Sequence, residues 1–252
     1  MISVIMAVKD NLIATRKGID SILAADIEPI ELIIINNGSL KETQKYLESI
    51  NVTLINNKEN KGCAYAWNQG IKASKGKYVC IVNNDIEVPH DWLKCLKTYL
   101  TKGPYALVSP AMREGELDYS LEEMNQTYRE VFGGKVFEGE IRGTALFAEK
   151  DLFNKTGLFD ESFRWGKYED EDFFIRLKLH GLKTAVITDC CIHHYGSKTV
   201  NQMKKELPFD FEKINRKVFF KKWWWLYPWR KFNKYRIKMR HRITFKKTGL
   251  PY

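Results

Sequence analysis

Two groups of side chains in this chain could together transfer a group from a phosphate ester. Asn83, Asn84 and Asp85 follow a short apolar run at residues 78–82, which is typical of a buried strand. Polar side chains at the end of such a strand lie where open α/β sheets bind their ligands. Asp85 could therefore hold Mg²⁺ or Mn²⁺, ions that share their coordination with phosphate oxygens. The alternative is that Asp85 only caps a turn.

The second group is the acidic run at residues 169–172, which opens a helical pattern further along the chain. A carboxylate in the first turn of a helix is stabilised in its ionised form by the helix dipole. Such a group can take the proton of an attacking hydroxyl. The alternative is that these four acids only cap the helix.

Two glycine-rich nucleotide signatures are absent from the chain. There is no G-x-x-x-x-G-K-[ST] loop, which argues against a P-loop NTPase. The first strand is not followed by G-x-G-x-x-G, which argues against a dinucleotide enzyme. A nucleotide diphosphate must therefore be neutralised in another way, and a divalent metal held by few carboxylates is the common solution.

The elements that would position these groups alternate between strand and helix patterns. Strand patterns cover residues 3–8, 31–36, 52–56 and 77–83. Helical patterns separate them, and Ser39 with Glu42 forms a capping-box signature for one of these helices. Such alternation with short connections predicts an α/β fold with a doubly wound, mostly parallel, Rossmann-like sheet.

The second half of the chain is less regular. Residues 110–140 lose the pattern and carry many charges and glycines, so we expect an irregular excursion over the site. We expect regular structure to return at residues 143–148, followed by a helix at 170–180 and a last strand at 184–188.

Composition indicates a cytoplasmic protein. The 252 residues suffice for one large domain, and no stretch approaches the ~20 apolar residues that span a bilayer. Residues 1–8 are apolar but lack a basic leader and a cleavage site, so they are interpreted as a first strand. The five cysteines lack metal-site spacing, which favours a reducing compartment.

The end of the chain differs from the body in charge. Residues 213–252 hold 14 of the 41 lysines and arginines and none of the 31 aspartates and glutamates. Aromatic residues, above all tryptophans, lie among these charges, a composition that favours anionic membrane surfaces. We therefore predict a domain at residues 1–205 and a basic, aromatic extension at 206–252 that contacts the inner face of the cell membrane. The alternative is that its aromatic side chains pack back onto the domain.

Six short segments in a fixed order resemble the family 2 glycosyltransferases, which have the GT-A fold. They are residues 3–6, 35–39, 60–85, 157–163, 168–172 and 193–197. The resemblance covers about residues 1–200 and includes counterparts of the family's D-[DN]-G-S, D-x-D, G-x-F-D, E-D-x-D and H-x-x-G-x-S elements. It implies an inverting transferase that uses a nucleotide-diphosphate sugar and Mn²⁺ or Mg²⁺.

The resemblance also implies a metal site. Asp85 matches the metal-binding aspartate of D-x-D, while Asn83 replaces the first aspartate of that motif. Asn36 replaces an aspartate expected to read the nucleobase, so the choice of base is open. We expect at least one of His193 and His194, with His193 favoured, to contact the metal or the diphosphate. The alternative is one core histidine and one surface histidine.

The resemblance assigns the remaining site residues. The nucleotide-sugar contacts are Ala7, Asn36, Asn37, Asn60, Gly62, Asn68, Asn83, Asn84 and Gly143, with Thr144 on the donor side. Asp170 matches the catalytic base, and Glu169 orients it or the acceptor. Trp165, Tyr168 and Asp172 are expected on the acceptor side, although Trp165 could equally be a core residue.

We therefore expect transfer of a sugar from a UDP-, dTDP- or GDP-sugar to a hydroxyl of a glycan, lipid-linked or protein-linked acceptor. Nothing in the body of the chain indicates nucleic-acid binding. The alternative hypothesis is a non-catalytic relative that binds a sugar nucleotide or a glycan, because asparagine replaces aspartate at residues 36 and 83.

Overall fold

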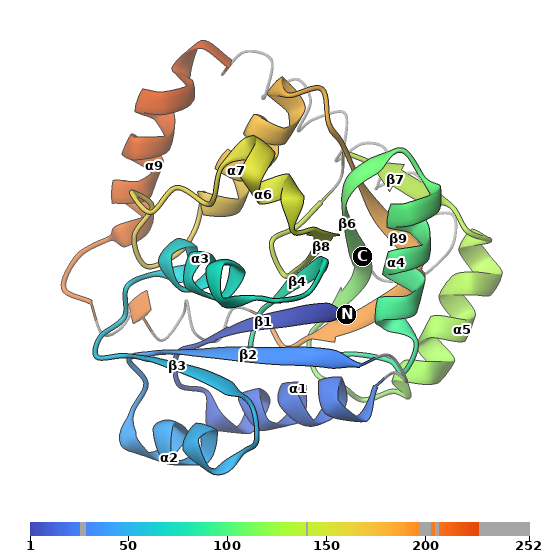
Figure 1. Cartoon of the computed structure of the whole chain (residues 1–252), viewed down its shortest axis with the longest axis horizontal. Helices are drawn as coiled ribbons and strands as arrows, with labels where there is room; N and C mark the ends of the chain where they lie inside the picture. Colours follow the sequence, from blue (N-terminus) through green and yellow to red (C-terminus); the bar gives the residue numbers. More distant parts are fainter. Residues whose placement is uncertain (26–28, 140, 197–202, 205–206, 227–252) are drawn as a thin grey trace.

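The fold is described from a computed structural model of the chain (Figure 1). The structure describes residues 1–25, 29–139, 141–196, 203–204 and 207–226. A single mixed sheet runs through it, and helices cover both faces, as expected for a doubly wound α/β fold.

The nine strands of the described chain form one sheet in the order β3-β2-β1-β4-β8-β6-β9-β5, with β7 paired to β9. The strands are β1 (Ile2–Val8), β2 (Ile30–Asn37), β3 (Thr53–Asn57), β4 (Tyr78–Val82), β5 (Ile86–Glu87), β6 (Tyr105–Glu114), β7 (Val136–Glu138), β8 (Ala145–Glu149) and β9 (Lys183–His194). β1 to β4, β6 and β9 run in one direction, which confirms a mostly parallel sheet. The antiparallel strand β8 lies between β4 and β6.

The central strands are apolar along their length because helices cover both faces of the sheet. β1 and β4 are almost entirely buried, and Ile2 is paired with Tyr78 in register. Alternate residues of β1 contribute to different cores: Val4 and Met6 to one, Ile5 to the other. The register is therefore fixed, since a shift by one residue would exchange the two faces.

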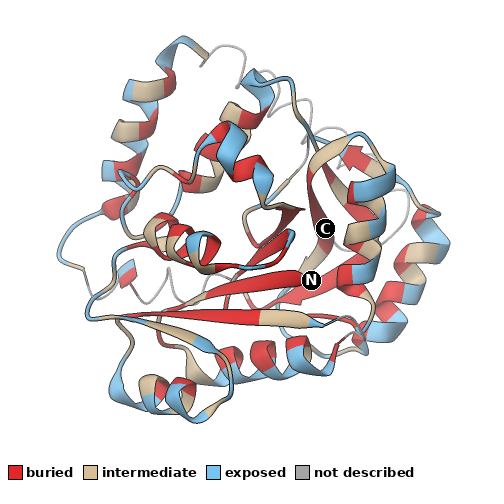
Figure 2. Cartoon of the chain, in the orientation of Figure 1, coloured by how far each residue is buried: buried red, intermediate tan, exposed pale blue. Residues whose placement is uncertain are grey.

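Six helices build these two cores. α1 (Leu12–Ala24), α2 (Lys41–Ser49) and α4 (Trp92–Lys102) cover one face, and α3 (Cys63–Ala73), α6 (Asp151–Thr156) and α7 (Glu169–Leu179) cover the other. Figure 2 shows the central strands buried and the helices buried on the side that faces the sheet. This arrangement leaves the ends of the parallel strands as the edge where polar side chains can gather.

The expectation of an irregular excursion at residues 110–140 is wrong. β6 continues to Glu114, helix α5 spans Leu121–Phe132, and β7 follows. Leu121, Met124 and Tyr128 form the buried side of α5 at helical spacing. Ser120 caps this helix by accepting a hydrogen bond from the backbone N–H of Glu123, so the capping signal was present in the sequence.

The start of the C-terminal extension is folded against the domain. Helix α9 (Phe211–Trp223) and a 3₁₀ turn (Trp224–Leu226) place Phe219 and Trp223 in a small core with Phe163. In contrast, Phe220, Trp224 and Trp225 are exposed. The predicted boundary at residues 205 and 206 and the aromatic residues Tyr227, Trp229, Phe232 and Tyr235 lie outside the described residues.

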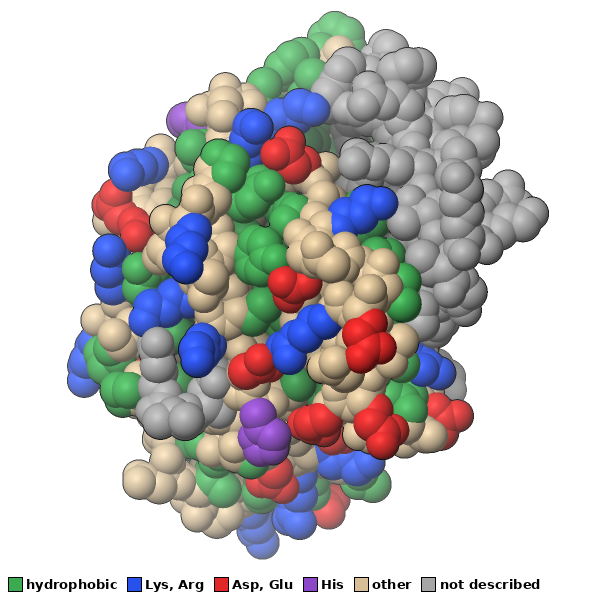
Figure 3. Space-filling view, turned by 90° about the vertical axis from the view of Figure 1, so that its right-hand side faces the viewer, with side chains coloured by type: hydrophobic (Ala, Val, Ile, Leu, Met, Phe, Trp, Pro, Cys, Tyr) green, Lys and Arg blue, Asp and Glu red, His purple; other side chains and the backbone are tan. Residues whose placement is uncertain are grey.

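The described surface has mixed charge. Figure 3 shows one face on which acidic and basic side chains are interspersed with apolar ones. Among the described helices, none has both the length and the apolar character needed to cross a bilayer.

Candidate active site

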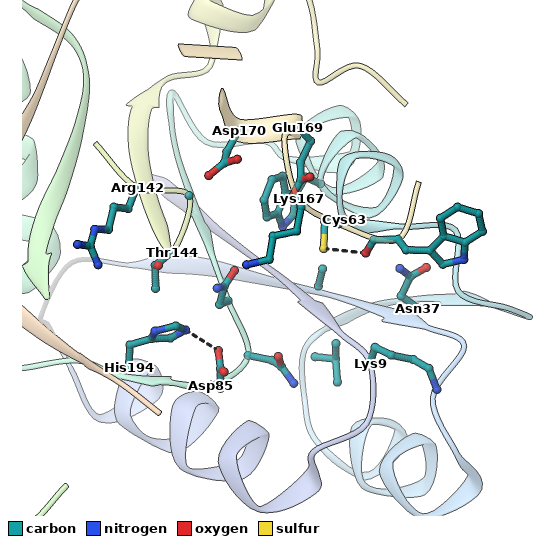
Figure 4. A pocket seen from close by; sticks show the side chains of 18 of the residues that line it. Lys9, Asn37, Cys63, Asp85, Arg142, Thr144, Lys167, Glu169, Asp170 and His194 are labelled. Atoms are coloured by element: carbon teal, nitrogen blue, oxygen red, sulfur yellow. Dashed lines mark hydrogen bonds and ion pairs between the residues drawn. The ribbon is translucent and has the colours of Figure 1, made fainter. Parts of the chain in front are cut away.

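Side chains from both halves of the chain line one cavity of about 400 Å³ (Figure 4). Its wall combines the carboxyl ends of β1, β4, β6 and β9 with the segment before β8 and the first turn of α7. Because β8 runs antiparallel to its neighbours, the segment before it lies at the same edge as the ends of β4 and β6. Asp85 and Asp170 therefore share one cavity although they are far apart in sequence.

Most of the predicted site residues line this cavity. They are Ala7, Asn37, Asn60, Asn83, Asn84, Asp85, Gly143, Thr144, Trp165, Glu169, Asp170 and His194. Asn36, Gly62, Asn68, Tyr168, Asp172 and His193 do not line it.

At the first end, Asp85 and His194 face each other. Nε2 of His194 lies 3.2 Å from Oδ1 of Asp85, and Nδ1 of His194 lies 3.1 Å from a carboxylate oxygen of Glu114. Burial alone would lower the pKa of His194, but hydrogen bonding and the charges of Asp85 and Glu114 outweigh it and raise the pKa. The imidazole is thus held between two carboxylates.

This end of the cavity fits a divalent metal. Nε2 of His194 is buried and, despite its closeness to Asp85, makes no hydrogen bond of good geometry among the described residues. A carboxylate on the remote ring nitrogen, here Glu114, is the usual partner of a metal-binding histidine. Within the described chain no ready-made cluster of three ligands exists. Asp85 and His194 would therefore share a metal with ligand oxygens.

We expected His193, rather than His194, to contact the metal or the diphosphate, and the placement of its ring contradicts this expectation. Successive side chains of β9 point to opposite faces, so His193 points away from the cavity when His194 points into it. His193 is fully buried, and its Nδ1 lies 2.7 Å from the hydroxyl of Tyr119. Burial lowers its pKa. His193 is thus the core histidine and His194 the site histidine.

At the other end, Asp170 and Glu169 begin α7. Asp170 is partly exposed at the cavity wall, and its Oδ1 accepts a hydrogen bond from the backbone N–H of Glu171. Burial and the charge of Glu171 raise its pKa. Glu169 is buried, and its Oε2 has no hydrogen-bond partner among the described residues. Burial and the charge of Asp170 raise the pKa of Glu169 to about 8, so one carboxyl of the pair is protonated at neutral pH.

Gly143 is in close contact with the Asp170 carboxylate. A Cβ atom placed on Gly143 would lie 2.6 Å from Oδ2 of Asp170, which is closer than a carbon and an oxygen can approach. The absence of a side chain at this position thus leaves space for the carboxylate. This observation places Gly143 at the end of the cavity that holds Asp170.

The amide side chains on the donor side are occupied within the protein. Asn37 donates to Asn60 at 2.9 Å and accepts from Asn57 at 3.1 Å. The amide of Asn36 is buried and donates to Asn56 at 2.8 Å. Asn36 and Asn37 therefore brace the loops beside the cavity in this structure.

Two further predicted contact residues support the cavity wall from behind. Asn68 exchanges two hydrogen bonds with the backbone of Phe159, at 2.9 and 3.0 Å. Gly62, with φ of +91°, lets the backbone nitrogen of Trp165 approach so closely that a Cβ would lie 2.7 Å from it. Both residues thus fix segments that reach the cavity.

The expected acceptor residues are split between the cavity and α9. Trp165 lines the cavity, and its ring lies 4.9 Å from that of Phe209. Tyr168 instead packs on Phe219, with ring centroids 5.2 Å apart. Asp172 is fully buried and accepts hydrogen bonds from Arg176 at 3.0 Å and from Trp223 at 2.8 Å. Asp172 therefore joins α7 to α9 and is not open to an acceptor.

Several cavity residues were not predicted from the sequence. They are Val8, Lys9, Cys63, Trp67, Met112, Glu114, Ile141, Arg142, Gly166, Lys167, Glu171, Phe174 and Met203. Glu114 lies in the segment that the sequence predicted to be irregular, because the strand that carries it shows no clear pattern. Lys167 lies two residues before the acidic run, which was the one available signal for it.

Comparisons with known proteins identify the family of the chain. The family model described as "Glycosyl transferase family 2" matches residues 3–167. An uncharacterized glycosyltransferase of Rickettsia prowazekii (strain Madrid E) is 29% identical over 212 residues, which cover 73% of this chain and 66% of that protein. The chain thus spans slightly under two thirds of this relative.

Solved structures show the same fold at low identity. The crystal structure of GalNAc-T7 with UDP, GalNAc and Mn²⁺ matches with a TM-score of 0.62 at 15% identity, covering 77% of this chain and 44% of that one. TarS (residues 1–349) of S. aureus in complex with UDP-GlcNAc matches with a TM-score of 0.61 at 16% identity, covering 77% and 58%. With its sheet, its cavity and the match over most of the domain, the chain belongs to glycosyl transferase family 2 and has the GT-A fold.

Proposed function

We propose that the chain is an inverting, metal-dependent glycosyltransferase that moves a sugar from a nucleotide-diphosphate sugar to an acceptor hydroxyl. The observation that carries the proposal is the pair of carboxylates, Asp85 and Asp170, at opposite ends of one cavity of about 400 Å³. Support for the donor class comes from two proteins of the same fold, whose structures contain UDP with Mn²⁺ and UDP-GlcNAc.

Asp85 and His194 would hold the metal, either Mn²⁺ or Mg²⁺, with Glu114 fixing the imidazole. When bound, the metal supplies positive charge to the diphosphate of the donor. The buried setting of Asp85 and His194 strengthens electrostatic interactions there, because the local dielectric is low.

Asp170 would act as the base. The acceptor hydroxyl transfers its proton to the Asp170 carboxylate while its oxygen forms a bond to the anomeric carbon. The bond between that carbon and the diphosphate oxygen breaks on the opposite face, and the nucleoside diphosphate takes the electron pair, so the configuration inverts. The raised pKa of Asp170, caused by burial, makes it a stronger base than an exposed aspartate. Glu169, held protonated by burial, leaves Asp170 as the ionised member of the pair.

The acceptor is proposed to be a glycan, or a glycan linked to lipid or protein. Exposed Phe220, Trp224 and Trp225 at the end of α9 and in the 3₁₀ turn continue into the basic extension. We propose that this surface contacts an anionic membrane on the cytoplasmic side, where a lipid-linked acceptor would reside.

The test is release of the nucleoside diphosphate from a panel of UDP-, dTDP- and GDP-sugars in the presence of Mn²⁺. We expect one donor to be consumed by the wild-type chain. Asp85→Ala should abolish donor use and Asp170→Asn should lower kcat about 10²- to 10⁴-fold, the usual size of a base effect. Donor use by Asp85→Ala equal to that of wild type would remove the metal role.

The same assay separates the proposal from a non-catalytic relative, the alternative suggested by Asn36 and Asn83. A chain that binds a sugar nucleotide but consumes none, with any of several acceptor glycans, would favour that alternative. Near-wild-type transfer by Asp170→Asn would instead show that another group is the base.

A further inference from the structure

The loop that leads into the acidic run has an unusual backbone. Trp165, Gly166, Lys167 and Tyr168 all have positive φ angles, of 67°, 149°, 74° and 76°. Three of these residues are not glycine, and a left-handed backbone is unfavourable for them. Such a conformation persists only where surrounding contacts enforce it, and it is frequent at functional sites.

Asn215 in helix α9 provides those contacts. Its side-chain amide donates hydrogen bonds to three backbone carbonyls of the loop, those of Arg164 at 2.7 Å, Gly166 at 2.8 Å and Lys167 at 3.2 Å. Asn215 is fully buried. A single amide from the C-terminal extension therefore holds the loop in its left-handed form.

Helix α9 is itself tied to the helix that follows the loop. Trp223 donates to Asp172 of α7 at 2.8 Å, and the ammonium group of Lys222 lies 2.7 Å from the same carboxylate. Lys222 also bonds Asp160 at 2.6 Å, in the segment that precedes the loop. The loop is thus anchored on both sides by one helix, which begins beyond the residues matched by the family model.

The held loop directs Lys167 into the cavity. Figure 4 shows its side chain extending from the loop towards the middle of the cavity, between the end with Asp170 and the end with Asp85. Among the described residues, none forms an ion pair with the Lys167 ammonium group, whereas Lys9 of the same cavity is paired with Asp10. Lys167 therefore offers its charge to a ligand.

We propose that Lys167 binds the diphosphate of the donor and that Asn215 positions it to do so. The proposal rests on the proposed nucleotide-diphosphate sugar. A diphosphate is negatively charged. Asn83 is neutral and stands where the family's motif has an aspartate, so this site has one negative charge fewer than the family pattern. A lysine on a flexible stem with three donors can follow the diphosphate oxygens as negative charge grows on them. Lys167 donates hydrogen bonds in this step, and no proton is transferred to the leaving oxygen.

The first measurement is binding of UDP, dTDP and GDP, with Mn²⁺, and of the three corresponding nucleosides. We expect Lys167→Ala to weaken binding of the preferred diphosphate about 10- to 100-fold, as for loss of a charge-assisted hydrogen bond. Binding of the nucleoside should stay within about twofold of wild type, and Lys167→Arg should restore most of the affinity for the diphosphate. Lys213→Ala, which removes an exposed lysine from α9, is the matched control and should bind like wild type.

The second measurement tests Asn215 through a double-mutant cycle. Asn215→Ala should weaken diphosphate binding in the wild-type background but add little in the Lys167→Ala background, because the amide acts through the lysine. A purely structural role would weaken binding equally in both backgrounds. Asn154→Ala, at an exposed amide of α6, is the control for the loss of an asparagine side chain.

The outcomes are distinguishable. Diphosphate binding by Lys167→Ala equal to that of wild type would overturn the role of Lys167, and additive losses in the cycle would overturn the positioning role of Asn215. If wild type binds none of the three diphosphates, the proposed donor class fails instead.

Discussion

At the scale of single residues, alternation along a strand separates the two neighbouring histidines. His193 and His194 are equivalent in the sequence, but β9 extends to include both, so only one side chain can face the cavity. The sequence pattern ended the last strand at residue 188 and therefore gave no basis for choosing between them. His194, whose Nδ1 contacts Glu114, is the one that lines the cavity and that we propose as a metal ligand.

Replacing Glu114 by glutamine should weaken metal binding without removing a ligand. The carboxylate is the partner of Nδ1 of His194, and loss of such partners typically lowers metal affinity about 10- to 100-fold. Titration of the chain with Mn²⁺, followed by isothermal calorimetry, measures the change. Glu116→Gln, a neighbouring acid that does not line the cavity, is the matched control. Unchanged Mn²⁺ affinity in Glu114→Gln would contradict the assigned role.

The buried carboxyl of Glu169 predicts a pH dependence of stability. Its pKa is about 8 in the folded chain, against an ordinary value of 4.5, so the unfolded chain releases this proton first as the pH rises. The free energy of unfolding should therefore fall between about pH 4.5 and 8, where only the folded chain still holds the proton. Glu169→Gln removes the ionisation, so its thermal midpoint should fall less than that of wild type between pH 5 and 8. Parallel profiles for the two chains would contradict this prediction.

At the scale of elements, the antiparallel strand β8 brings its own starting segment to the catalytic edge. Gly143 lies just before β8 and against Asp170, which begins α7. The position of the Asp170 carboxylate and that of the segment before β8 therefore depend on each other.

Gly143→Ala should impair catalysis more than folding. The new methyl group would lie 2.6 Å from Oδ2 of Asp170, and the carboxylate would have to rotate away from the cavity. The φ of Gly143 is not in the left-handed region, so the backbone accepts alanine. We expect kcat to fall at least about tenfold, in line with the sensitivity of catalysis to small displacements, while the thermal midpoint changes little. Gly181 lies in an open turn, does not line the cavity and has φ of +70°. Gly181→Ala should therefore lower the thermal midpoint while kcat changes little.

The sequence predicted the regular half of the fold well. The first four strands lie within one residue of the predicted ranges at most ends, because long apolar runs and helical spacing are strong signals. The capping box at Ser39 and Glu42 is wrong: α2 begins after Leu40, and the Ser39 hydroxyl bonds the backbone of Val8 and Asp10 instead. Local patterns identify elements, but tertiary partners decide what a polar side chain bonds.

Only the site residues that belong to a local pattern could be predicted from the sequence. Asp85 and Asp170 were identified because each follows or opens a clear element in a recognisable motif. Asn215 gave no signal, since a lone asparagine in a basic, aromatic helix resembles any surface amide. Its contacts to residues 164–167 depend on the docking of α9, which the sequence does not encode locally.

At the scale of the whole molecule, charge is distributed unevenly along the chain. The described body carries acidic and basic groups side by side, while the basic excess is concentrated after residue 212. Because α9 is packed on the domain through Phe219 and Trp223, these two side chains of the predicted extension are not available to a membrane.

A chain that ends after residue 226 should keep the fold and lose most membrane binding. It retains α9 and the 3₁₀ turn but lacks the last nine lysines and arginines of the chain. Each basic residue near an anionic surface contributes about 1 kcal/mol, so the loss should be large. Co-sedimentation with vesicles containing phosphatidylserine, compared with neutral vesicles, measures it. Equal binding by the full and the shortened chain would rule out the anchor.

The loop at residues 164–168 takes its shape from a helix that is synthesised after it. All nine strands of the described chain lie before residue 195, so an emerging polypeptide can pair its sheet while Asn215 has yet to leave the ribosome. Until that amide arrives, the carbonyls of Arg164, Gly166 and Lys167 lack the three hydrogen bonds that it donates. We therefore expect the loop to take its final shape only after the sheet that carries the rest of the cavity has formed.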